Sequence, residues 1–395
     1  MEFREKAYLS IASSFRFFFI NAAVITLQML FEGISASSFQ IGLIQSAMWG
    51  GILIFAQFWG ALADITGEKR KVLMFSTVVA GVLMPFFSII ENIWGLLFLM
   101  FVISSFSSSF PPIGLAITSE RSEKDDRGRN MSVFNSSRSV GITTGRMLAG
   151  VFLGFMAYRE IFLFYGAVGI ATVLAVWKLS GTDSHRSFEI KNAVKESLKK
   201  IVPRDLGRLW HTNGHKYLLM AIFIRKAAIT GVYSMLPIFI VTVKGLSNGS
   251  MGVIAGTGPA VQIILMLVFG NLVDRLGRKK VFSAGFLLCA TVPIIYAYST
   301  TFWMFISGSI ILGIAFSAIT AGTTAFIGDI APKKRQGELL GVRKTVQGLA
   351  GVFGGIAGGV LTGIMGYHGM FYTMSGMMVL GFFIALYKTS ETLSH

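Results

Sequence analysis

Long apolar runs alternate with short polar connections along almost the whole chain. Twelve runs are predicted to be spans, at 9–31, 41–63, 72–90, 94–118, 130–156 and 160–179, and then at 217–243, 249–273, 280–298, 301–328, 338–366 and 369–388. A helix needs about 20 mostly apolar residues to cross the hydrocarbon core. Because a membrane barrel would show short alternating segments instead, the pattern predicts an all-α membrane protein.

One polar loop pattern occurs twice. The connection after the second run reads Gly60-Ala-Leu-Ala-Asp64-Ile-Thr-Gly67-Glu-Lys69-Arg70, and the one after the eighth reads Gly270-Asn-Leu-Val-Asp274-Arg275-Leu-Gly277-Arg278-Lys279. In each copy a glycine ends the apolar run, an aspartate follows four residues on, and a second glycine allows a tight turn. The two copies indicate that the chain is a duplicated unit.

The duplication extends beyond these loops. Arg225 follows Arg16 by 209 residues, and Gly354 follows Gly145 by the same offset. Because both halves start on the same side, we expect two six-helix bundles that are parallel repeats, at 1–180 and 217–395. The polar segment 181–216 joins them, and its apolar residues recur at helical spacing between lysines. It is either a basic amphipathic helix on the inner membrane surface or a solvated linker.

Composition agrees with an integral membrane protein, because 53% of the 395 residues are hydrophobic and only 14% are charged. The net charge of +16 reports topology rather than nucleic-acid binding, since only Arg159 and Lys244 fall in odd-numbered loops. By the positive-inside rule both termini are cytoplasmic. We expect a multi-pass protein of the cell membrane, in contact with lipids, without a cleavable signal peptide. Cys289 is the single cysteine, so no internal disulfide forms.

These loops and the six-plus-six pattern resemble the major facilitator superfamily over essentially the whole chain. The resemblance implies alternating access, in which two bundles expose a central site to one side at a time. It also implies a monomer, and a gate in which Asp64 meets span eleven and Asp274 meets span five. Glu120 and Asp329 would pair with Lys69/Arg70 and Arg278/Lys279. The gating candidates are Gly60, Asp64, Gly67, Lys69, Arg70, Glu120, Gly270, Asp274, Arg275, Gly277, Arg278, Lys279 and Asp329.

The first copy departs from the family pattern at Ile65 and Glu68, where basic residues are usual. The glycines of span five, Gly141, Gly145 and Gly150, resemble a motif of drug-exporting members, although Arg146 stands where that motif has a proline. Span four lacks the arginine that many proton-coupled exporters carry. The motifs therefore indicate the superfamily and only favour its export branch.

Charged residues inside a span indicate function, because each costs at least about 2.5–3.5 kcal/mol at mid-span. Arg146 lies near the middle of span five, where it either binds an anionic or polar group or packs against backbone carbonyls. Arg225 and Lys226 are adjacent in span seven, so at most one of them faces the cavity centre. Arg16 is shallow, and we expect it to snorkel to the interface. Near cytoplasmic helix starts, anchoring is expected of three further residues, Arg138, Arg343 and Lys344.

Neutral polar and aromatic residues complete the expected substrate site. Each could line a cavity or form an interhelical hydrogen bond of about 0.6–2 kcal/mol. The full substrate-binding set is Arg146, Asn21, Gln28, Gln45, Trp49, Arg225, Tyr233, Gln262 and Thr324.

No Asp, Glu or His lies mid-span, which argues for a facilitator, an exchanger, or an unfamiliar coupling group. No metal-ligand cluster, nucleophile constellation or nucleotide-binding loop is present, so neither an enzyme nor a cofactor is expected. The sequence predicts alternating-access transport of a small organic solute, favouring export of an amphipathic compound. Uptake or exchange of an organic anion or sugar, and a non-transporting receptor or lipid-handling scaffold, remain alternatives. A coupling ion is left open.

Overall fold

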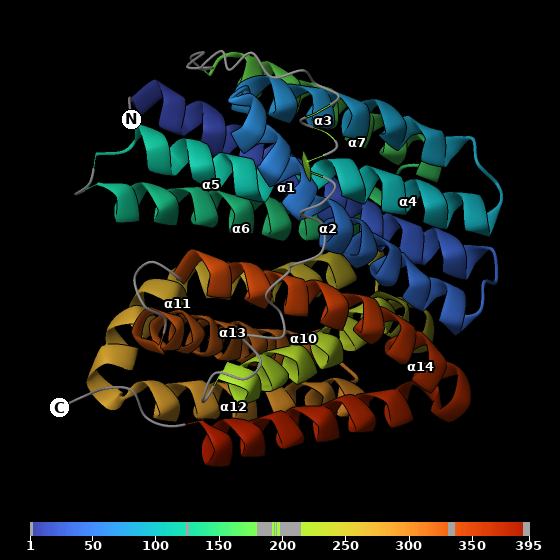
Figure 1. Ribbon diagram of the computed structural model, residues 1–395. Coiled ribbons are helices and arrows are strands. Elements are labelled where there is room, and N and C mark those ends of the chain that lie inside the picture. Colours follow the sequence, from blue (N-terminus) through green and yellow to red (C-terminus); the bar gives the residue numbers. More distant parts are fainter. Residues whose placement is uncertain are drawn as a thin grey trace. The chain divides into compact units, whose positions relative to one another are not determined.

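Helices form the framework of the described chain. The computed structural model describes residues 3–123, 126–179, 192, 194, 196–197, 215–330 and 336–389, and no strand occurs in these ranges. The predicted all-α class is therefore confirmed. The helices of the first half are α1 (Phe3–Gly33), α2 (Ser38–Thr66), α3 (Lys69–Leu83) with the 3-10 turn η1 (Met84–Ser88), α4 (Ile93–Ser107), α5 (Phe110–Arg121), α6 (Arg127–Phe152) and α7 (Tyr158–Trp177) (Figure 1).

The second half has α10 (His215–Ile238) with a π-helical end η2 (Phe239–Val243), α11 (Asn248–Leu276), α12 (Arg278–Tyr298), α13 (Phe302–Ile330) and α14 (Gln336–Lys388). Ten helices of the described part are long and apolar enough to cross a membrane. One of them, Gly341–Lys388, has 48 residues and provides two passes. Helix α6 is more polar, with Arg138 and Arg146 among several Ser, Thr and Asn residues, yet its 26 residues also suffice for a crossing.

Backbone features divide the continuous helix α14 and interrupt the predicted fourth span. Gly366 has φ 71° inside α14, so the backbone leaves helical geometry there and divides the helix into spans eleven and twelve. The fourth span breaks between α4 and α5, at Ser108 and Ser109. Pro111 and Pro112 follow directly, and neither can donate the backbone hydrogen bond that would continue α4.

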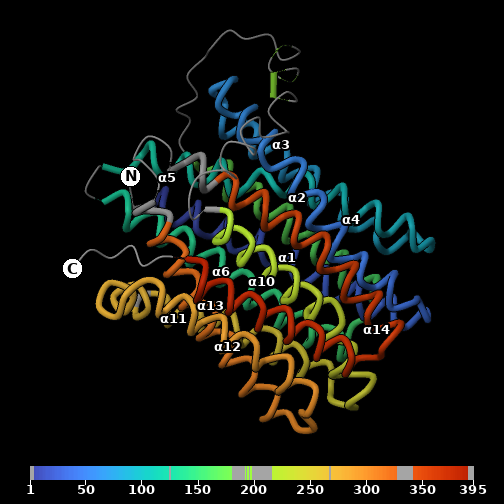
Figure 2. Tube along the Cα trace, turned by 60° about the horizontal axis from the view of Figure 1, so that its bottom comes forward, coloured from blue at the N-terminus to red at the C-terminus, as the bar shows by residue number. Residues whose placement is uncertain are grey.

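The chain divides into two compact units by its internal contacts. Unit 1 comprises residues 1–30 and 47–202, and unit 2 comprises 31–46 and 203–395. In unit 1, α3 packs on α7 and α5 packs on α6. In unit 2, α10 packs along α14, and α12 packs on α13, as the tube in Figure 2 shows. Unit 2 also includes the start of α2, where Ser46 Oγ donates to the Val352 carbonyl over 2.7 Å.

The internal duplication is visible as equivalent contacts. Gly145 of α6 packs on the backbone of Phe18 in α1, and Gly354 of α14 packs on the backbone of Ala227 in α10. Both members of the second pair lie 209 residues after those of the first. An aromatic contact repeats in the same way, since Phe87–Phe162 and Tyr296–Phe371 have ring centroids 4.9 and 6.5 Å apart. The two-repeat fold expected from the sequence is confirmed.

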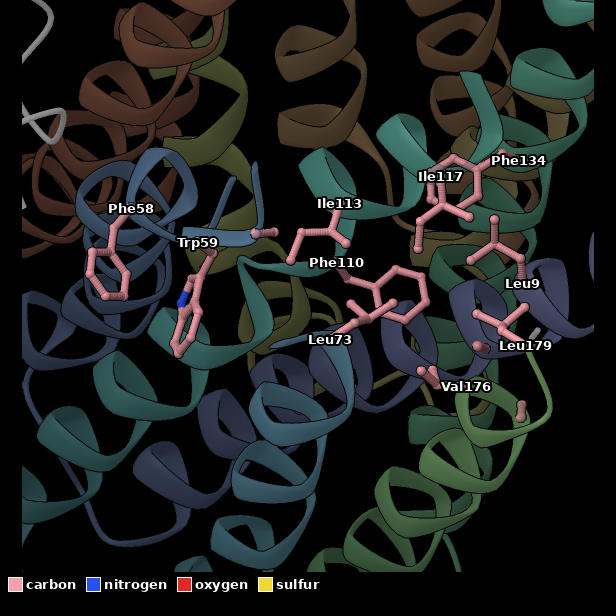
Figure 3. Packing of buried hydrophobic residues seen from close by; sticks show 13 residues of the cluster. Leu9, Phe58, Trp59, Leu73, Phe110, Ile113, Ile117, Phe134, Val176 and Leu179 are labelled. Atoms are coloured by element: carbon pink, nitrogen blue, oxygen red, sulfur yellow. The ribbon is translucent and has the colours of Figure 1, made fainter. Parts of the chain in front are cut away.

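A cluster of apolar side chains holds together the end of unit 1 that carries the first loop copy (Figure 3). Leu73 of α3, Phe110 of α5 and Phe134 of α6 are all buried in it, and the rings of Phe110 and Phe134 stack with centroids 6.3 Å apart. Trp59 of α2 donates its indole N–H to the Ser105 carbonyl over 2.8 Å. Closely packed apolar side chains therefore support the helix ends beside Asp64.

Most of the linker 181–216 lies outside the described residues, so both interpretations of that segment stay predictions. Val194, which is described, packs against the apolar cluster of unit 1. The bundle boundaries at 180 and 217 likewise stay a prediction.

Replacing either repeated glycine with alanine should destabilise the protein. A Cβ at Gly145 would lie 2.5 Å from the Phe18 carbonyl oxygen, and the equivalent Cβ at Gly354 would strike the Ala227 carbonyl. Overpacking of this kind costs about 1–3 kcal/mol. We expect Gly145→Ala and Gly354→Ala to lower the unfolding midpoint measured in detergent by several degrees.

The matched control is Gly376→Ala in α14, where an added Cβ has no neighbour within 4 Å. This change should keep or slightly raise the midpoint, because alanine favours a helix more than glycine does. Equal midpoints for Gly354→Ala and Gly376→Ala would contradict the close approach of α14 to α10.

Candidate functional site

The first loop copy ties together the ends of four helices in unit 1. Gly67 has φ 71°, which makes the tight turn between α2 and α3. Lys69, at the start of α3, places its Nζ 2.7 Å from Glu120 Oε1 and 3.6 Å from Asp64 Oδ1. Arg70 donates to the Trp177 carbonyl at the end of α7. The predicted contact between Glu120 and Lys69 is therefore present.

The strength of this network is modest. Lys69 is 17% exposed, but the side chains of Asp64 and Glu120 are 67% and 59% exposed. Exposed ion pairs contribute about 0–1 kcal/mol. Contacts of this size can bias an equilibrium between two conformations without locking the protein in either of them. The gating role of Gly60, Asp64, Gly67, Lys69, Arg70 and Glu120 stays a prediction.

The second loop copy repeats the turn. Gly277 has φ 95° and joins α11 to α12. Asp274 Oδ1 lies 4.0 Å from Arg278 Nη2, and its side chain is 69% exposed. Arg275 is exposed, and Lys279 is half-buried. The side chain of Asp329 lies outside the described residues, so its predicted pairing with Arg278 or Lys279 stays open.

The predicted substrate-binding residues divide between the two units. Asn21, Gln28, Trp49 and Arg146 belong to unit 1, and Gln45, Arg225, Tyr233, Gln262 and Thr324 belong to unit 2. Gln28 and Gln45 are buried, and Trp49, Arg146, Tyr233 and Gln262 are half-buried. Asn21 and Thr324 each donate to a carbonyl of their own helix, at 2.9 and 2.8 Å.

Within unit 2, the structure places two of these residues near each other. The Tyr233 hydroxyl lies against Gly258 of α11, 3.5 Å from where a Cβ would stand. Gln262 follows Gly258 by one helical turn, so α10 and α11 present Tyr233 and Gln262 to the same region.

Arg225 is a buried cation without a carboxylate partner in the described part of unit 2. It is 8% exposed, and its Cζ lies 5.3 Å from the centre of the Phe316 ring. The buried thiol of Cys289 is its electrostatic neighbour. Among the described residues its Nε has no hydrogen-bond partner. Burial of this cation without an acid makes it a candidate contact for an anionic group.

The snorkelling expected of Arg16 is wrong. The side chain is 3% exposed and donates from Nη2 to the Ser107 carbonyl. That carbonyl would normally accept from the residue four positions on, which is Pro111 and has no N–H. Arg16 therefore satisfies a backbone group that the proline leaves open. Its depth was underestimated because the polar residues before residue 9 also belong to α1, which begins at Phe3.

Two further charged contacts escaped the sequence analysis. Arg138 of α6, expected to anchor the helix, lies with its Cζ 5.1 Å from the centre of the Phe17 ring. Arg121 of α5 and Glu5 of α1 form an ion pair of 2.7 Å with side chains 14% and 11% exposed. The sequence signal for the Arg121–Glu5 ion pair would have been two opposite charges at the expected cytoplasmic ends of spans one and four.

The family model named Major Facilitator Superfamily matches residues 9–261 and 218–395 of this chain. The multi-drug resistance efflux pump PmrA of Streptococcus pneumoniae is 22% identical over 373 residues, which cover 90% of each chain. The sugar efflux transporter B of Salmonella typhimurium is 22% identical over 340 residues, covering 84% of this chain and 82% of the relative.

Among solved structures, that of the nucleoside transporter NupG superposes with a TM-score of 0.79 at 14% identity, covering 98% of this chain and 100% of the other. The fold and the sequence matches thus agree with the resemblance to the major facilitator superfamily that was inferred from the two loop copies. The chain belongs to the major facilitator superfamily and is a multi-pass membrane transporter of small solutes, not an enzyme.

Proposed function

We propose that this transporter exports a small amphipathic organic solute from the cytoplasm by alternating access. The observation that carries the proposal is the similarity to efflux transporters, PmrA and the sugar efflux transporter B, over more than four fifths of the chain. The repeated contact of Gly145 with Phe18 and of Gly354 with Ala227 supports it, because two equivalent rigid units are what alternating access needs.

Coupling through a buried carboxylate is not part of the proposal. The 19 acidic residues of the sequence all fall at helix ends, in loops, in the linker or at the termini. A proton-coupling carboxylate is usually buried, since burial moves its pKa towards neutrality. We therefore propose facilitated transport or exchange, driven by the solute gradients themselves.

The membrane location, the orientation and the gate of the transporter can be proposed as well. We propose a monomer in the cell membrane with both termini in the cytoplasm, in agreement with the positive-inside distribution of Lys and Arg. The two loop copies would act as the cytoplasmic gate. Lys69 supports this role, because it connects Glu120 at the end of α5 with Asp64 at the end of α2. Arg146, half-buried in α6, is proposed to contact the solute's polar group.

Transport should not require a pH gradient. Liposomes containing the purified protein are loaded with a fluorescent amphipathic probe, and efflux is followed with and without a pH gradient. We expect equal rates in both conditions, because no mid-span carboxylate or imidazole is available to carry a proton. A rate that rises only with the gradient would overturn the uncoupled mechanism. If neither amphipathic anions nor cations nor sugars leave the liposomes, the export proposal is overturned and a scaffold role is favoured.

Asp274→Asn should reduce efflux by about tenfold or more, since conformational couplings are typically worth about 1–3 kcal/mol. Insertion and the unfolding midpoint should stay near those of the unaltered protein, because the Asp274 side chain is 69% exposed and its contact with Arg278 is long. The measurement is liposome efflux normalised to inserted protein.

Glu91→Gln provides the control, because Glu91 is an exposed carboxylate between η1 and α4, away from the two loop copies. It should transport normally. If Asp274→Asn transports as well as Glu91→Gln, the aspartate only anchors its loop and the gate proposal fails.

A further inference from the structure

Two arginines share one aromatic ring in unit 1. Arg16 Cζ lies 4.2 Å from the centre of the Phe17 ring, and Arg138 Cζ lies 5.1 Å from the same centre. Arg16 comes from α1 and Arg138 from α6, so the arrangement is a tertiary feature rather than a local one. The ring face attracts each cation, but the two cations repel one another.

The helices that carry the two arginines are held at a fixed distance. Ser14 Oγ of α1 donates to the Ser137 carbonyl of α6 over 2.9 Å. One helical turn further, Gly141 allows the backbones to approach so closely that a Cβ there would strike the Ser14 carbonyl. Because the Ser137 contact directly precedes Arg138, the α1–α6 contact holds the Cα atoms of the two arginines close to each other.

The positive charge of this pair is not neutralised by the described protein. Arg16 is 3% exposed; one of its nitrogens donates to the Ser107 carbonyl, and its Nε has no hydrogen-bond partner among the described residues. Arg138 is half-buried and forms no ion pair in the described ranges. A buried charge without a partner is costly, so an additional cation beside Arg16 is strongly unfavourable unless an anion binds there.

The repeat shows that Arg138 is not needed to build the fold. The position 209 residues after Arg138 is Gln347 in α14, and the same helix packs on α10 through Gly354. Arg225, the equivalent of Arg16, is therefore buried without a second arginine at the equivalent place. The contact between the first and fifth helices of a repeat therefore forms in the second half with a neutral glutamine at this place.

We propose that Arg16 and Arg138 together bind an oxyanionic group, a carboxylate, phosphate or sulfonate, of the transported solute. Planar guanidinium groups hold such groups through paired, charge-assisted hydrogen bonds. Arg16, which is held by its hydrogen bond to the Ser107 carbonyl, supplies a fixed guanidinium group. Arg138 is half-buried, so the oxyanionic group would reach the site from its side. The buried Phe17 ring holds both guanidinium groups in place through its contacts with them. This inference rests on the proposed export function and names its substrate as an organic anion.

Binding can be measured apart from transport. The full-length protein in phosphatidylcholine nanodiscs is titrated with 1-naphthalenesulfonate and with sodium sulfate, and the unfolding midpoint is recorded at constant ionic strength. We expect a saturable rise in the midpoint with both anions, and a weakening of apparent affinity by about tenfold or more in Arg138→Gln. That variant copies the residue at the equivalent position of the second half, so it should fold.

The matched control is Arg129→Gln, which removes an exposed arginine from the same helix. It should bind as the unaltered protein does. Equal affinities of Arg138→Gln and Arg129→Gln would overturn the proposal, as would a loss confined to Arg146→Ala. A rise that needs phosphatidylglycerol in the nanodisc and no soluble anion would assign the site to a lipid headgroup instead. Arg16→Gln serves as a second test where it folds, and it should abolish the rise.

Transport measurements distinguish anion binding by Arg16 and Arg138 from the export function itself. In liposomes, Arg138→Gln should lose efflux of 1-naphthalenesulfonate and keep efflux of an uncharged amphipathic probe. Equal loss of both probes would contradict a role in anion recognition. Absence of all efflux from the unaltered protein, with anion binding intact, would remove the export function but leave the binding site.

Discussion

Hydrocarbon offers no hydrogen bonds, and this constraint determines the structure from the backbone to the buried charges. Every peptide group within the membrane must be satisfied by the protein, which leaves helices as the framework of this chain. Where a helix is interrupted, another group has to take over. The break after α4 shows how this works: Pro111 leaves the Ser107 carbonyl without its usual donor, and the buried guanidinium of Arg16 donates to it. A charge that would otherwise be costly is thereby retained inside unit 1.

The same medium gives helices no hydrophobic reason to associate, so close packing has to replace it. Glycines serve this purpose at Gly145 in the first repeat and at Gly354 in the second, each against the backbone of the first helix of its half. Equivalent contacts hold the first helix of each repeat against the fifth. Exposed ion pairs such as Lys69–Glu120 are weak by comparison, as the proposed gate requires if it is to open repeatedly.

Much of the fold could be predicted from the sequence, because hydropathy and the 209-residue repeat report directly on spans and topology. The predicted span 280–298 agrees with α12 to within two residues. Individual side chains were harder to place. The depth of Arg16 was underestimated because polar residues at the start of α1 concealed its first turns, which begin at Phe3 rather than at residue 9. The pairing of Arg138 with Phe17 depends on how α6 lies against α1, which no local pattern records.

The central claim is that two equivalent units alternate the side on which the solute has access. Spin labels at Lys71→Cys and Lys280→Cys, which are repeat mates on the cytoplasmic loops, test it together with a second pair at Glu91→Cys and Thr300→Cys on the outer side. Both pairs are introduced into a Cys289→Ala background, since that cysteine is the only one in the chain. Pulsed electron paramagnetic resonance should show solute shifting the two distance distributions in opposite directions. Distributions that stay fixed, or that shift in the same direction, would contradict alternating access.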